Sequence, residues 1–177
     1  PFVIPAHILA AWRKAAERCI HDRLTWEQRF AALSPERRAE FQRTSTGGLR
    51  PNWQVPLNEF KRRLADERPK WATRKASGEA LEILTANFRE MVGGSADLTD
   101  SVFTKTKRMD DISAGNYHGR YIHYGVREHA MASVMNGVAL HGGFIPYGGT
   151  FLVFSDYMRG GMRMSALMKQ RVIYVLT

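Results

Sequence analysis

The stretch YIHYGVREHAMASVMNGVALHGGFIPY, residues 121–147, reads as a strand, a helix and a second strand. Tyr121–Tyr124 is a short apolar run typical of a strand. Apolar residues then recur at helical spacing from Glu128 to about Leu140, namely Met131, Val134, Met135 and Val138. Gly142-Gly143 ends that helix, and Phe144–Tyr147 gives the next strand. Such a unit predicts two parallel strands joined by a right-handed crossover.

The same alternation extends in both directions along the chain. Residues 76–90 have the spacing of an amphipathic helix, and Met91–Asp97 reads as a strand that runs into a glycine turn. Gly148-Gly149-Thr150 is expected to open a helix that reaches about Met168, and Arg171–Thr177 is an apolar strand of the kind buried on both faces. The pattern predicts an α/β fold, a mostly parallel sheet flanked by helices.

The first 70 residues have a different character. Helical spacing covers Ala6–Arg18, Trp26–Arg43 with a break at residues 34–36, and Leu57–Ala65, whereas no strand pattern occurs. A linker pattern at Glu67–Lys70 then leads into the alternating region. We therefore expect a helical segment at 1–70 and an α/β part at 71–177. Because the helices have no sheet of their own and the chain ends on an apolar strand, we also expect a fragment of a longer protein.

Charge is unevenly distributed. The 177-residue chain has a net charge of +9, and residues 1–75 carry 16 Lys and Arg against 8 Asp and Glu, whereas residues 76–177 carry 10 against 9. Acidic residues are interleaved with the basic ones, which is typical of solvated helix faces and argues against a nucleic-acid partner. A basic nucleic-acid-binding module remains the alternative from a different class, with four tryptophans as stacking groups: Trp12, Trp26, Trp53 and Trp71.

Other features exclude several classes of protein. Cys19 is the single cysteine, so no disulfide can form within the chain, and no cysteine cluster can hold zinc. The six histidines show no repeated metal-ligand spacing, so no metal site is expected from them. There is no apolar run of ~20 residues and no signal-peptide pattern, which favours a non-exported, cytoplasmic protein without a membrane partner.

Three local patterns could carry chemistry, and each has a structural alternative. GGSADLT, residues 93–99, follows a strand, so Asp97 is either a ligand group or a helix cap. Glu128 begins an otherwise apolar helix, where a carboxylate is either catalytic or paired with the helix dipole. Phe151, Phe154 and Tyr157 are three apart and are expected on one helix, where they form either an aromatic wall or part of the core.

These patterns occur together and in a fixed order. GGSADLT, GRYIHYGVREHAM, MNGVALHGGFIPYGGTF and the YVLT strand closely resemble the pyrimidine-binding domain of transketolase over residues 71–177. Residues 1–70 resemble the end of that family's diphosphate-binding domain and its linker. The resemblance implies a truncated thiamine-diphosphate-binding fold. It also implies an enzyme of the pentose phosphate pathway that transfers a two-carbon ketol unit between phosphorylated sugars.

The resemblance also implies roles for residues at the cofactor. Glu128 would be the catalytic glutamate, which hydrogen-bonds the aminopyrimidine ring of thiamine diphosphate and relays a proton. Phe151, Phe154 and Tyr157 would form the pocket for that ring, and Asp97 would lie near the thiazolium end. The family's GDG…N motif is absent. The ligands of Mg²⁺ (or Ca²⁺) would therefore lie outside this fragment, and the fragment alone would be inactive.

Two positions match the family's contacts to the substrate phosphate, Arg74 and Ser101. Val102 departs from the pattern, since asparagine commonly follows that serine. The implied partners are sugar phosphates and a second copy of the chain, with the active site between two subunits. Dihydroxyacetone synthase and deoxyxylulose-phosphate synthase are the related alternatives. The second typically has Glu-Gln-His where this chain has Arg127-Glu128-His129.

Overall fold

The computed structural model describes residues 2–177, which divide into two compact units, one up to Gln42 and one from Arg43 to Thr177. The helices of the first part are α1 (Ala6–Glu17), α2 (Ile20–Ala31) and α3 (Pro35–Ser45). The break expected near residue 35 is confirmed, and Ser34 caps α3, because its hydroxyl accepts a hydrogen bond from the Arg37 amide at 3.3 Å. None of the three helices contains a buried residue.

The second unit is built on a parallel sheet. Within residues 2–177 it has four strands, all parallel, in the order β2-β1-β3-β4. The strands are β1 (Met91–Ser95), β2 (Tyr121–His123), β3 (Ile145–Thr150) and β4 (Ile173–Leu176). The expected α/β fold, a mostly parallel sheet flanked by helices and preceded by a helical segment, is confirmed.

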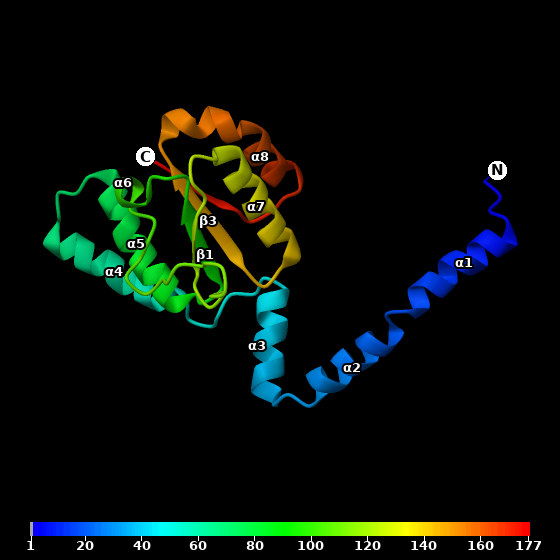
Figure 1. Ribbon diagram of the computed structural model, residues 1–177. Helices are drawn as coiled ribbons and strands as arrows, with labels where there is room; N and C mark the ends of the chain where they lie inside the picture. The colour runs from blue at the N-terminus through cyan, green and yellow to red at the C-terminus, as the bar shows by residue number, and fades with distance from the viewer. Residues whose placement is uncertain (1) are drawn as a thin grey trace. The chain divides into compact units, whose positions relative to one another are not determined.

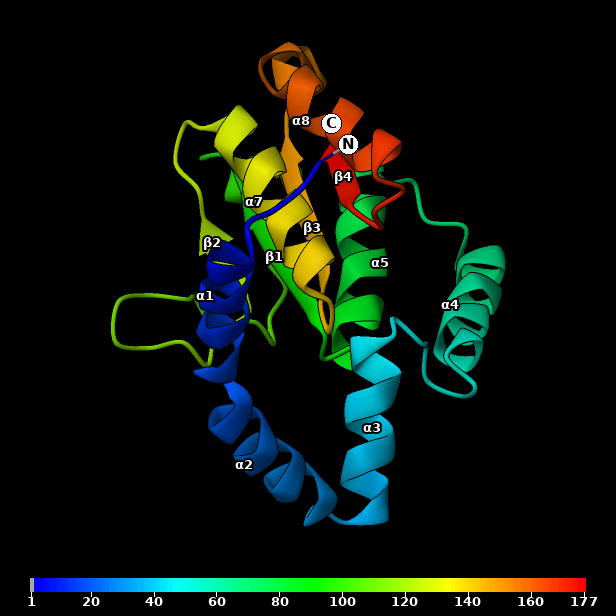
Figure 2. The same ribbon diagram turned by 90° about the vertical axis from the view of Figure 1, so that its right-hand side faces the viewer.

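Helices cover both faces of this sheet (Figure 1). On one face, Leu81 of α5 (Thr73–Asn87) and Phe88, which directly follows that helix, pack in a core that includes Tyr147, with α4 (Gln54–Glu67) outside it. On the other face lie α7 (Glu128–His141) and α8 (Ser155–Leu167), whose methionines form a second core. Figure 2 shows α7 running alongside β3. The short α6 (Thr99–Val102) and the 3-10 turn η1 (Leu152–Phe154) follow β1 and β3.

Two glycine pairs lie inside strands instead of in turns. Gly148-Gly149 was expected to open a helix, but both glycines belong to β3, every residue of which is buried. A Cβ on Gly148 would lie 2.7 Å from the Met135 sulfur, and one on Gly149 would lie 2.5 Å from the Thr104 methyl carbon. Helix α8 therefore begins only at Ser155. Gly93-Gly94 likewise lies in β1, and the turn comes at Asp97 with φ of +64°.

The last strand differs in burial from the expectation. It was expected to be buried on both faces, but β4 lies at one edge of the sheet and only Val175 in it is buried. Ile173 is 37% exposed. The other face of the strand packs through Tyr174 and Leu176 against the methionine core of α7 and α8.

Buried polar contacts hold the segment between α6 and β2. The Tyr147 hydroxyl donates to the Thr104 carbonyl at 2.7 Å, and burial raises the pKa of Tyr147 well above its ordinary value. The Arg120 guanidinium donates to five backbone carbonyls at 3.2–3.5 Å: those of Thr85, Phe88, Arg89, Met91 and Arg108. These contacts tie residues 104–120 to the end of α5 and the start of β1.

Candidate functional site

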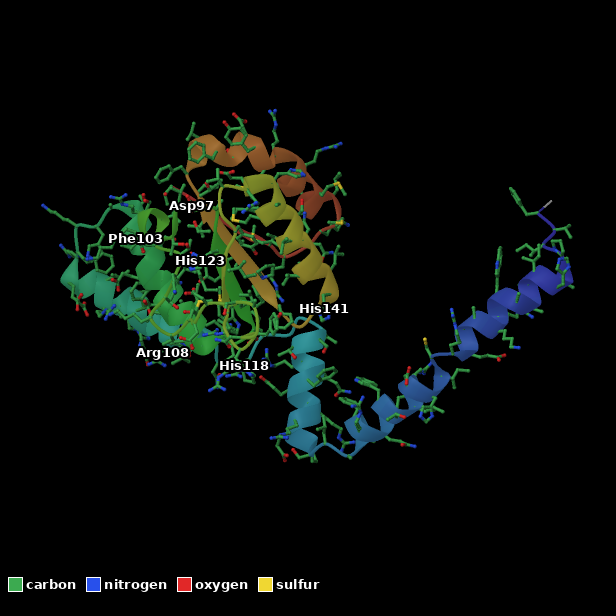
Figure 3. The ribbon with its side chains drawn as sticks, in the orientation of Figure 1. Asp97, Phe103, Arg108, His118, His123 and His141 are labelled. Carbon is green, nitrogen blue, oxygen red and sulfur yellow. The ribbon has the colours of Figure 1, made fainter. Side chains whose placement is uncertain are left out.

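The predicted site residues follow the carboxyl ends of three strands of the sheet. Asp97 comes two residues after β1, Glu128 five residues after β2, and Phe151 directly after β3. Because all the strands are parallel, their carboxyl ends meet at one edge, which is where open α/β sheets bind ligands. Asp97 is exposed there (Figure 3).

Glu128 lies at the wall of a hollow of about 690 Å³. The hollow is also lined by Val126, Phe154 and Tyr157, so much of its wall is apolar. Glu128 is only 7% exposed as a residue. Its carboxyl group makes no hydrogen bond or ion pair with any of residues 2–177. Neighbouring Arg127 forms no ion pair with it, and its guanidinium donates to the Tyr124 carbonyl at 3.0 Å. Glu128 is thus nearly buried as a residue, while its unpartnered carboxyl group keeps enough exposure to contact a ligand in this hollow.

The three aromatic rings form one continuous row. The ring centres of Phe151 and Phe154 are 5.9 Å apart with an interplanar angle of 28°, and those of Phe154 and Tyr157 are 6.1 Å apart. The expectation that all three share one helix is wrong, because Phe151 precedes η1, Phe154 ends it and Tyr157 lies in α8. Tyr157 is 68% exposed, so the row is an open wall instead of core.

Close packing of α7 against α8 fixes the position of this wall relative to Glu128. Gly161 of α8 faces Ala132 of α7 so closely that a Cβ on Gly161 would lie 2.6 Å from the Ala132 Cβ. Buried Asn136 donates from its side-chain nitrogen to the Gly161 carbonyl at 2.9 Å, and the Ser165 hydroxyl donates to the Asn136 oxygen at 2.5 Å. The two helices that carry Glu128 and Tyr157 are thus locked together.

A second, polar groove of about 550 Å³ lies beside Asp97 and Ser101. Arg74, at the start of α5, contacts this groove through Ser101. The Arg74 guanidinium is 3.5 Å from the Ser101 carbonyl oxygen and lies over the Phe103 ring at 5.8 Å. Val102, which departs from the family pattern, is fully buried, so its side chain does not reach the groove. The structure brings Arg74 and Ser101 together, as a shared role requires.

Sequence reasoning missed three residues of this groove, Lys105, Asp111 and His123. The Asp111 carboxylate is 2.7 Å from the Lys105 ammonium and 3.0 Å from His123 Nε2. The hydrogen bond from Lys105 is the main cause of the lowered pKa of Asp111, and the one from His123 adds to it. Only His123 could have been found from its place at the end of a strand, since the other two belong to an irregular segment.

Residues 2–177 contain no group of three His, Cys, Asp or Glu side chains that could hold a metal ion. No helix in that range has both the length and the apolar character needed to cross a membrane.

Comparison with known proteins agrees with this geometry. A sequence model described as "Transketolase, pyrimidine binding domain" matches residues 69–177. This chain belongs to the transketolase family. The sequence resemblance to transketolase is therefore confirmed.

The relatives are similar over the whole chain. The transketolase of Rhodobacter capsulatus is 49% identical over 177 residues, which is 100% of this chain and 26% of that protein. The solved transketolase of Leishmania mexicana has a TM-score of 0.84 at 36% identity and covers 98% of this chain and 26% of its own. A Pichia stipitis transketolase solved with sedoheptulose 7-phosphate gives the same values. The chain spans about a quarter of the length of these transketolases. Nothing in the structure or the comparisons favours either related synthase or a nucleic-acid-binding module.

Proposed function

We propose that this chain is part of a transketolase that moves a two-carbon ketol unit between phosphorylated sugars with thiamine diphosphate as its cofactor. The observation that carries the proposal is the unpartnered carboxyl group of nearly buried Glu128 beside an aromatic wall, within a chain that matches the pyrimidine-binding domain. Residues 1–70 would be the end of the diphosphate-binding domain and the linker, and residues 71–177 the first part of the pyrimidine-binding domain.

The residues fit the aminopyrimidine part of the cofactor. A flat heteroaromatic ring suits the row of Phe151, Phe154 and Tyr157, which would stack on it and exclude water. Glu128 would hold a proton on its carboxyl oxygen and share it with a ring nitrogen, because it has no protein partner with which to share it. When bound, thiamine diphosphate supplies an electron sink for breaking a carbon–carbon bond next to a carbonyl group.

The polar groove would bind the phosphate end of the sugar substrates. Arg74 would bind the phosphate group as a charged fork, with the Ser101 hydroxyl as a second donor. Asp97, which lines the polar groove, would face the thiazolium end of the cofactor. The diphosphate group and its Mg²⁺ (or Ca²⁺) would be held by residues outside this chain, and a second subunit would complete the active site of a homodimer.

The test is a ketol-transfer assay on the full-length protein. A seven-carbon donor such as sedoheptulose 7-phosphate and a three-carbon aldose phosphate should give two five-carbon sugar phosphates, because two carbons pass from one to the other. Product formation should need both thiamine diphosphate and a divalent cation. A full-length protein that folds, binds the cofactor and still transfers no carbon from any phosphorylated ketose would refute the proposal.

A further inference from the structure

A pocket of about 430 Å³ lies at the amino ends of the strands, whereas the site described above lies at their carboxyl ends. Its wall includes residues 142–144, which precede β3, and residues 169–171, which precede β4. These strands are parallel, so both segments lie at their amino ends. Figure 3 shows His141 at the end of α7 nearest these strand ends and Asp97 toward the other end of the sheet. We refer to this cavity as the amino-end pocket.

The charges around the amino-end pocket are all of one sign. Lys169, Arg171 and His141 line it, and none of the described lining residues is an aspartate or a glutamate. Glu90, which directly precedes β1, is paired with Arg43 at 2.8 Å. Because no carboxylate in the wall offsets the two permanent positive charges, the pocket attracts anions.

The two permanent cations differ in how they are held. The Arg171 guanidinium donates to the Gly47 carbonyl at 3.0 Å, and this one bond leaves several of its N–H donors for a ligand. The Lys169 ammonium makes no hydrogen bond or ion pair with any of residues 2–177. The fixed guanidinium of Arg171 and the free ammonium of Lys169 together suit the oxygens of a phosphate group, which accept several hydrogen bonds at once.

The shape of the pocket also depends on close packing at glycines. A Cβ on Gly47 would lie 3.0 Å from the Arg171 guanidinium, and one on Gly142 would lie 3.2 Å from the Ser45 carbonyl oxygen. The segment after α3 therefore closes one wall of the pocket. Its volume is within the range of small-molecule sites and exceeds what a bare phosphate ion needs.

We propose that the amino-end pocket binds the phosphate group of a small phosphorylated molecule, at a site separate from the one that contains Glu128. This assignment needs no catalytic role for the chain. It adds a second phosphate-binding position to the one proposed at Arg74.

The test measures the reactivity of Lys169 in the full-length protein. Lysines are acetylated briefly with N-hydroxysuccinimidyl acetate at constant ionic strength, with sodium chloride replaced stepwise by inorganic phosphate, and each site is quantified by mass spectrometry. Acetylation of Lys169 should slow about threefold at ~20 mM phosphate, the effect of a Kd of about 10 mM. Exposed Lys61 of α4 is the internal control and should not change.

Variants separate this site from other causes. Arg171→Gln should abolish the protection, whereas Arg163→Gln, which removes an exposed charge on α8, should leave it intact. Protection that persists in Arg74→Gln places the phosphate at the amino-end pocket and not at the proposed substrate site. Equal reactivity of wild-type Lys169 with and without phosphate, or equal slowing at Lys61, would overturn the proposal. Matched titrations with sedoheptulose 7-phosphate and AMP identify the source of the phosphate group, since the true ligand protects at the lowest concentration.

Discussion

Replacing Glu128 with glutamine separates a proton-carrying carboxyl group from one that merely starts a helix. Glutamine has nearly the same shape and still fills the first position of α7. No hydrogen bond or ion pair within residues 2–177 is lost, because the Glu128 carboxyl group has none there. The cost in stability is therefore limited to the interaction with the helix dipole, about 0.3–1 kcal/mol.

The effect on catalysis should be much larger. A glutamine amide cannot give its proton to a ring nitrogen and take it back, so the rate should fall roughly 10²–10⁴-fold, the range for a lost general acid–base. At 1.36 kcal/mol for each factor of ten, this loss is about 2.7–5.4 kcal/mol in the barrier. It exceeds the dipole contribution several times over, so one substitution distinguishes the two roles.

The assay is hydrogen–deuterium exchange at C2 of bound thiamine diphosphate in the full-length protein, followed by quenched NMR, with cofactor occupancy measured separately. Asp22→Asn is the matched control, since Asp22 is also an acidic residue in the first turn of a helix, α2, and is exposed. The control should exchange at the wild-type rate. If the Glu128→Gln protein exchanges as fast as wild type at full occupancy, Glu128 has no part in proton transfer and the reasoning fails.

Three further outcomes follow from the packing and charge of the second unit. Gly161→Ala should lower the free energy of unfolding by about 1–2 kcal/mol, because overpacking against Ala132 outweighs the gain in helix propensity. Gly137→Ala should raise it by up to about 1 kcal/mol, because a Cβ there would have no atom within 4 Å. Urea unfolding compares the two variants, and equal shifts would contradict the packing argument. Arg74→Gln should raise KM about 10- to 100-fold for a phosphorylated ketose and leave an unphosphorylated analogue unaffected, so an equal loss for both would remove Arg74 from phosphate binding. Burial raises the pKa of Tyr124 to about 12 and also raises the pKa of Tyr147. The stability that comes from keeping both phenols neutral is therefore present below about pH 10 and is lost as the pH rises toward 12. The urea midpoint should be lower at pH 11 than at pH 9, and Tyr124→Phe should reduce this difference.

The order of strands and helices was predictable because it depends on local periodicity. The strand at Tyr121 and the helix at Glu128 begin where the sequence pattern places them. The strand character of Gly148-Gly149 was not predictable, because it arises from side chains of distant segments that contact both faces of β3. Local preference alone favours a turn at two consecutive glycines.

The candidate site shows the same division. Glu128 and the aromatic residues belong to compact motifs, so the sequence identified them together. Lys105, Asp111 and His123 are separated by irregular chain with no period, and only the fold brings them into one groove. The motifs therefore identified the residues expected at the cofactor but not these three residues of the polar groove.

The five carbonyl contacts of Arg120 hold the backbone of residues 104–120, which carries part of the groove, through groups whose charge does not change with pH. Backbone carbonyls carry no proton to gain, and an arginine side chain stays charged over the whole working range of pH. Acidification can therefore neutralise Asp111 and release its contacts to Lys105 and His123 while residues 104–120 stay tied to α5 and β1. Shape and charge in this groove are controlled by different atoms, so substitutions at Lys105 or His123 can change its charge without a new backbone arrangement.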